Sequence, residues 1–175
     1  MFLPKIIKKM ILSTLTVIVS CLAMPPIEIS REATIYSFPL ATMALKLKEQ
    51  TALTPFNTFH KSSTLAAPGP SSQIPSPNAD TIYVYAWFDL RNEPAVITTP
   101  DFGLDDRFYI WEFIDFETNV IDSISPRTYP NGSVLDIILK TKSQTLPLDK
   151  SLGSNTKIIE SYSPIVWMVH LYEKN

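Results

Sequence analysis

Two histidines and the acidic residues limit the chemistry that this chain can support. His60 and His170 lie far apart in the sequence, and no Gly-x-Ser-x-Gly element occurs, so the local pattern of a serine hydrolase is missing. A zinc site needs three or four ligands, usually at short spacing, whereas each histidine stands alone. We therefore expect no metal and no cofactor, and His60 with Asp80 remains as the candidate catalytic acid–base pair.

A second candidate site combines polar residues from separate segments: Asn57, His60, Asn78, Asp80 and Arg127. In one interpretation they converge on a cleft, where Asn57, Asn78 and Arg127 bind a ligand. In the catalytic alternative, Arg127 stabilises an anion. In a third, the Asn78 and Asp80 side chains bond the neighbouring backbone and fix the loop to the sheet, and His60 is a surface or packing residue. The sequence leaves these interpretations open.

The segment from Asp80 to Leu90 is predicted to be a strand whose two faces differ in kind. One face carries Ile82, Val84, Ala86, Phe88 and Leu90, and the other carries Thr81, Tyr83, Tyr85, Trp87 and Asp89. We expect the first face to lie in the core. The rings of Tyr83 and Trp87 on the second face could stack against a small amphipathic ligand, and their polar groups could form hydrogen bonds with its edge. The alternative is that a second sheet or the N-terminal helix covers these rings.

The remaining patterns predict one helical segment and several strands. Apolar residues recur at helical spacing at Ile29, Ala33, Tyr36, Leu40, Met43 and Leu47, and Pro39 predicts a kink or two short helices. Further strands are expected at Ala95–Thr99, Arg107–Phe116, Ser133–Lys140 and Pro164–Tyr172. The predicted fold is α+β, mainly β, with the N-terminal helical segment packed on an antiparallel β-sandwich or jelly-roll-like sheet.

The N-terminus has the pattern of an export signal. Three lysines precede the apolar run Met10–Ala23, and Pro25 with Pro26 follows it, so we expect residues 1–23 to be a signal peptide and 24–175 to be one domain. Cys21 closes a segment that is similar to a bacterial lipobox, and lipidation at Cys21 and ordinary cleavage near Ala23 both stay open. The expected location is the periplasm, the cell envelope as a lipoprotein, or the medium, with membrane contact only through the signal or a lipid anchor.

Charge and cysteine content exclude two further classes. The chain has 15 basic and 17 acidic residues. It therefore lacks the excess of positive charge that is typical of nucleic-acid-binding proteins. Its single cysteine cannot form a disulfide within the chain, so the fold must depend on its hydrophobic core.

Several segments occur in the order typical of one bacterial family: Ala33–Leu40, Asn57–His60, Pro77–Tyr83, Ala86–Leu90, Arg107–Tyr109, Asp115–Val120, Arg127–Thr128 and Ser163–Trp167. Together they resemble the family called domain of unknown function 1254. The resemblance implies an exported protein with a β-rich domain, usually followed by a partner domain of unknown function 1214. The chain departs from the pattern late in the domain, where the closing glycine and arginine of the family are His170 and Leu171.

The resemblance and these departures lead to three expectations about function. The first is a noncatalytic module that binds a small amphipathic ligand or docks to a separately encoded partner domain, because the chain stops at Asn175, where the partner domain would begin. The second is an envelope enzyme, hydrolase-like, that uses His60 and Asp80. The third is a truncated gene product with an unpaired sheet edge.

Overall fold

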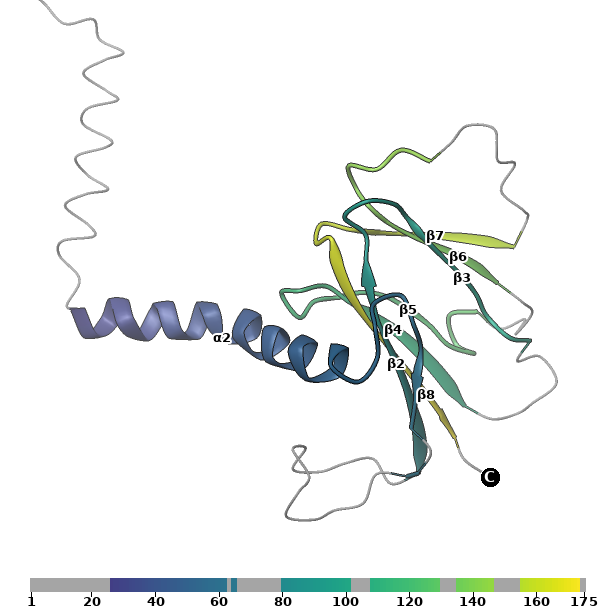
Figure 1. Ribbon diagram of the computed structural model, residues 1–175, viewed down its shortest axis with the longest axis horizontal. Helices are drawn as coiled ribbons and strands as arrows, with labels where there is room; N and C mark the ends of the chain where they lie inside the picture. The colour runs from purple at the N-terminus through teal and green to yellow at the C-terminus, as the bar shows by residue number, and fades with distance from the viewer. Residues whose placement is uncertain are drawn as a thin grey trace, which may run out of the picture. The chain divides into compact units, whose positions relative to one another are not determined.

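A computed structural model describes residues 26–62, 64–65, 80–101, 108–129, 135–146 and 155–173 (Figure 1). Contacts divide the chain into two compact units, Met1–Phe38 and Pro39–Asn175. The predicted signal segment at residues 1–23, Cys21 and Asn78 lie outside the described residues. All the site residues discussed below belong to the second unit.

Helix α2 spans Pro26–Thr51 and contains Pro39. Of the two alternatives predicted at Pro39, a kink or two short helices, the second is therefore wrong, and the boundary between the two units falls at this proline. Met43 is the buried residue of the helix, and Gln50 near its end bonds to the sheet, so the part after Pro39 packs as the sequence predicted. Within the described residues, no helix is both long and apolar enough to cross a membrane.

The strands of the second unit form two sheets (Figure 1). The five-stranded sheet has the order β1-β2-β8-β4-β5, and every neighbouring pair in it is antiparallel. Its strands are β1 His60–Lys61, β2 Thr81–Asp89, β8 Ile165–Glu173, β4 Tyr109–Ile114 and β5 Val120–Ile124. The three-stranded sheet has the order β3-β6-β7, with strands β3 Ala95–Thr98, β6 Asp136–Thr141 and β7 Thr156–Ser161.

Side chains of both sheets share one hydrophobic core. Phe88, Phe113 and Met168 come from the five-stranded sheet, and Ile97 and Leu139 come from the three-stranded sheet. The fold is thus α+β and mainly β, as predicted. One detail differs, because β6 and β7 pair in parallel where the sequence predicted antiparallel pairing throughout.

Three strands were not predicted from the sequence: β1, β5 and β7. Strand β1 has two residues, which is too short for an alternating pattern to be visible. Strands β5 and β7 carry polar residues among their apolar ones, so their sequences are similar to those of loops. The missing strands extend both sheets without changing the fold class.

The register of the central strands decides which side chains meet. Strand β8 pairs with β2 on one side and β4 on the other, and this places His170 opposite both Val84 and Trp111. Tyr172 lies in the next row on the same face, opposite Ile82 and Tyr109. Cross-strand partners have side chains on the same face of a sheet, so these residues define one surface, here called the cavity face.

Candidate functional site

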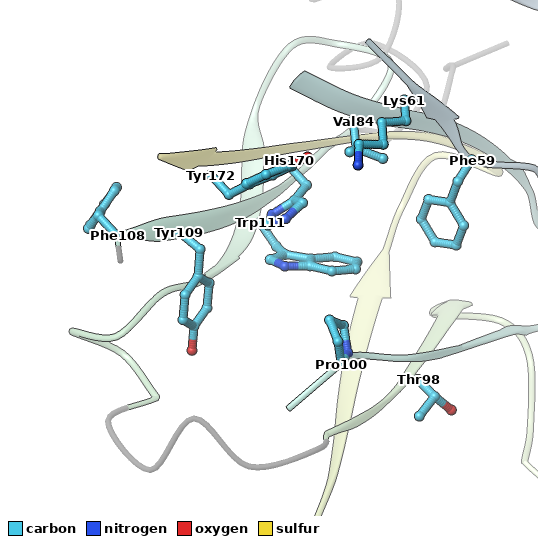
Figure 2. Close-up of a pocket in the computed structure, with 10 residues that line it drawn as sticks. All are labelled: Phe59, Lys61, Val84, Thr98, Pro100, Phe108, Tyr109, Trp111, His170 and Tyr172. Carbon is cyan, nitrogen blue, oxygen red and sulfur yellow. The ribbon is translucent and has the colours of Figure 1, made fainter. Parts of the chain in front are cut away.

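A cavity of about 430 Å³ opens on the cavity face, between the five-stranded sheet and the end of β3. Its volume falls within the range of about 300–1,000 Å³ that is typical of small-molecule sites. Six of its lining residues carry aromatic rings: Phe59, Phe108, Tyr109, Trp111, His170 and Tyr172. The other lining residues are Lys61, Val84, Thr98 and Pro100 (Figure 2).

The floor of the cavity is a row of contacting rings. The centroid of the His170 ring lies 4.6 Å from that of Trp111 and 5.5 Å from that of Tyr172. Phe59 meets Trp111 edge to face at 6.2 Å. Figure 2 shows the indole of Trp111 below His170, with Pro100 on its other side. Because Trp111 is 5% exposed and Phe59 46%, the row runs from the core to the surface.

His170 is neutral at pH 7 and has one defined tautomer. Its Nδ1 lies 3.1 Å from the carbonyl oxygen of Ile110, and because a carbonyl only accepts, Nδ1 carries the hydrogen and Nε2 is the acceptor. Burial lowers the pKa of His170 from 6.5 to about 4, against a smaller opposing effect of this hydrogen bond. The imidazole therefore supplies a flat surface and an acceptor nitrogen rather than a charge.

Two cations lie near rings that line the cavity. The Lys61 Nζ lies 5.6 Å from the centroid of the Tyr172 ring, and the Arg127 Cζ lies 5.9 Å from that of Phe108. Among the lining residues in the described ranges, none is acidic. Within the part of the chain that the structure describes, no three His, Cys, Asp or Glu side chains are placed to hold a metal ion.

The structure does not bring His60 and Asp80 together. His60 is the cross-strand partner of Tyr85, on the face opposite the cavity, where its ring stacks on Tyr85 at 4.7 Å and its Nδ1 lies 2.9 Å from the Thr54 Oγ1. Asp80 precedes the first residue of β2 and is exposed. Five residues of strand separate Asp80 from Tyr85, about 16 Å, so the proposed acid–base pair is not formed. Of the predicted cleft residues that the structure describes, His60 and Asp80 thus do not converge.

Asn57 has a structural role at the edge of β2. Its backbone lies in the left-handed region with φ 59°, its amide donates to the carbonyl of Trp87 at 2.8 Å, and its Oδ1 accepts from the amide of Asp89 at 3.0 Å. These bonds continue the pairing of β2 beyond the short β1. The Asn57 side chain, which was predicted to bind a ligand, therefore fixes the loop before β1 to β2.

Replacing Asn57 by alanine is expected to lower the free energy of unfolding by about 2 kcal/mol, since the bond to Asp89 is lost and alanine is disfavoured at positive φ. Asn57→Gly removes only the side-chain bond and should cost about 1 kcal/mol. Urea denaturation of the whole chain measures both values. Thr58→Ala, at the exposed neighbouring position, is the control, and an equal cost for alanine and glycine at 57 would contradict the role of the backbone conformation.

Tyr83 and Trp87 do not form an open binding surface. Trp87 is 2% exposed, its ring stacks on Trp167 at 5.6 Å, and its Nε1 donates to the Gln50 Oε1 of helix α2 at 2.9 Å. The alternative that the helix covers this face is thus correct for Trp87. Tyr83 lies half-buried on the same face, away from the cavity. Of the predicted ligand-binding residues in the described part of the chain, Arg127 alone approaches the cavity, through Phe108.

Sequence reasoning missed the residues that form the cavity, above all Lys61, Trp111 and His170. One signal was present, because His170 stands in a strongly apolar strand, Ile165–Glu173, at a position that alternates with Met168 and Val166. A histidine at a core-facing position of such a strand indicates a buried polar group. The register that places it beside Trp111 is not visible in the sequence.

Comparison with known proteins gives a family and a fold. The model of the family described as protein of unknown function DUF1254 matches residues 56–171. The fold is similar to the crystal structure of the VPA0106 protein from Vibrio parahaemolyticus, with a TM-score of 0.62, 17% identity, and coverage of 82% of this chain and 32% of that chain. This chain thus spans about a third of the length of that protein, and no curated protein matches it. From the match over residues 56–171, the chain belongs to the DUF1254 family.

Proposed function

We propose that this protein is an exported, noncatalytic module that binds a small amphipathic ligand in the aromatic cavity. The observation that carries the proposal is the continuous row of rings from Phe59 through Trp111 and His170 to Tyr172. Export rests on the basic and apolar pattern of residues 1–23. The expected ligand has a flat apolar part, because π faces favour stacked or edge-on contacts with another ring.

Polar groups around the rings explain why the ligand is amphipathic rather than wholly apolar. His170 offers an acceptor nitrogen, and Lys61 offers a charged donor at the rim. Burial raises the pKa of Tyr109, so its phenol is uncharged at neutral pH. A few polar groups placed around an apolar pocket fix the orientation of a bound molecule.

The chemistry of the lining supports binding rather than catalysis. A general acid or base works best with a pKa near the operating pH, whereas the pKa of His170 is about 4. The hydroxyl of Thr98 donates to the Asp136 Oδ1 at 2.7 Å, and a backbone carbonyl rather than a carboxylate holds His170. A nucleophile paired with an oriented base is therefore not assembled among the described lining residues.

Nuclear magnetic resonance of the indole N–H groups tests the proposal directly. The chain has three tryptophans, of which Trp111 lines the cavity while Trp87 and Trp167 stack together on the other face. Titration of the whole mature chain with 2-naphthamide, 2-naphthoate and 2-naphthylmethylammonium should shift the Trp111 signal and leave the other two in place. If none of the three probes shifts Trp111, the binding proposal is wrong.

Filling the cavity gives a second test. Val84 is half-buried and lines the cavity beside His170, so Val84→Phe should place a ring where the probe binds. The Kd for 2-naphthamide should then rise by about tenfold or more. Tyr83→Phe is the matched control, because position 83 lies on the opposite face of the same strand and its change should leave the affinity unaltered. Equal affinities of wild type and Val84→Phe would place the probe elsewhere.

A further inference from the structure

We propose that the cavity selects an anion: its ligand is a planar, ring-containing carboxylate whose charged end lies against Lys61 at the β1 edge. This inference rests on the proposed function and specifies the charge and the orientation of the ligand. It is carried by the place of Lys61 in the sheet, by the charges around the cavity, and by the protonation state of His170.

The register places Lys61 in line with the floor of the cavity. Lys61 pairs with Val84, Val84 pairs with His170, and His170 pairs with Trp111. One row of cross-strand partners therefore runs from the lysine to the indole, and all four side chains lie on the cavity face. Figure 2 shows Lys61 and Val84 on the same side of the cavity as His170, so a flat molecule resting on His170 and Trp111 would have one end that points along this row toward the ammonium group.

The charges around the cavity favour an anion. Among the described residues, no carboxylate lies within salt-bridge distance of Lys61, whose ammonium instead lies over the Tyr172 ring. The second cation, Arg127, lies over Phe108, and none of the lining residues that the structure describes is acidic. A cationic ligand would meet repulsion from both groups, whereas a neutral ligand would gain nothing from either.

His170 determines which end of the ligand carries the charge. Its Nε2 carries a lone pair in the plane of the ring, and the face of the neutral imidazole is a π surface, so neither gives a carboxylate a hydrogen-bond donor. At the β1 edge the carboxylate meets the exposed Lys61 and keeps part of its hydration, which limits the desolvation penalty. The apolar ring then covers Trp111 and His170, which are 5% and 6% exposed.

The experiment compares three probes of the same shape and different charge on the whole mature chain. The Trp111 indole signal should give a Kd for 2-naphthoate at least about threefold lower than for 2-naphthamide, the gain typical of a partly exposed ion pair. The Kd for 2-naphthylmethylammonium should be the highest. Added salt should raise the Kd for 2-naphthoate and leave the Kd for 2-naphthamide unchanged, because salt screens only the charged contact.

Substitutions assign the preference to Lys61. Lys61→Met should raise the Kd of 2-naphthoate to that of 2-naphthamide, and Lys61→Arg, which keeps the charge, should retain the preference. Lys142→Met is the matched control, since the Lys142 Nζ also lies over a ring, Tyr162 at 3.8 Å, and neither residue lines the cavity. The Trp87 and Trp167 signals report whether each variant is folded.

The two proposals fail in different ways. Equal Kd values for 2-naphthoate and 2-naphthamide, or a preference that survives in Lys61→Met, would overturn the selection of an anion and leave the binding function standing. Absence of any shift at Trp111 with all three probes would overturn the binding function and the charge selection with it.

Discussion

Trp87→Ala is expected to lower the free energy of unfolding by about 3–5 kcal/mol, the range for large aromatic residues removed from a core. Trp87 is almost fully buried, so the change leaves a void beside Trp167, which stacks on it. The Gln50 Oε1 also loses the indole N–H that donates to it. Urea denaturation followed by circular dichroism measures the loss.

A conservative variant separates packing from the hydrogen bond. Trp87→Phe keeps a ring against Trp167 and should cost about 1–2 kcal/mol, from the lost bond to Gln50 and the smaller buried area. The folded fraction of both variants should bind 2-naphthoate as the wild type does, because Trp87 lies on the face opposite the cavity. If a variant instead lost affinity for 2-naphthoate while its stability stayed unchanged, Trp87 would have to be part of the binding site.

The alternation of β2 shows what the sequence could and could not predict. The two faces were assigned correctly, and Ile82, Ala86 and Phe88 are buried as expected. The face that was expected to bind a ligand is covered at Trp87, and the cavity opens beside Val84 on the apolar face. Periodicity separates two faces but does not say which one a helix covers, and the contact of Gln50 with Trp87 joins residues distant in the chain.

Polar residues of the family-like segments are largely explained by turns. Asp115 accepts hydrogen bonds from the backbone amides of Glu117 and Asn119 and closes the β4–β5 connection, where Thr118 has φ 69°. The Thr128 Oγ1 similarly accepts from the amide of Ser125. Such bonds are the expected use of Asp and Thr at loop ends, so a polar residue in a recurring segment is weak support for a binding site.

The cavity itself could not be predicted because it depends on pairing between distant segments. Val84, Trp111 and His170 meet only through the register of β2, β8 and β4. A shift of one residue in β8 would turn His170 to the opposite face. The closing segment that departs from the family pattern at His170 thus provides the cavity floor, a role that the sequence alone did not indicate.

The second large effect concerns pH, and its source is again His170. In the unfolded chain its pKa is near 6.5, and in the folded chain it is about 4, so between these values the unfolded chain binds more protons. Stability must then rise with pH across this window and fall on acidification. The difference amounts to about 3 kcal/mol between pH 6.5 and pH 4, with a slope of up to about 1.4 kcal/mol per pH unit.

The slope is measured by urea denaturation at several pH values between 4 and 7. Carboxylates also titrate in this range, so the informative quantity is the difference between wild type and His170→Phe, which has no proton to gain at this position. Between pH 7 and pH 4 the free energy of unfolding of His170→Phe should fall by about 2–3 kcal/mol less than that of the wild type. His60→Gln is the control, since it removes the other histidine and leaves His170 buried. Equal slopes in wild type and His170→Phe would show that His170 charges freely in the folded protein, and the neutral acceptor that orients the proposed ligand would then be absent.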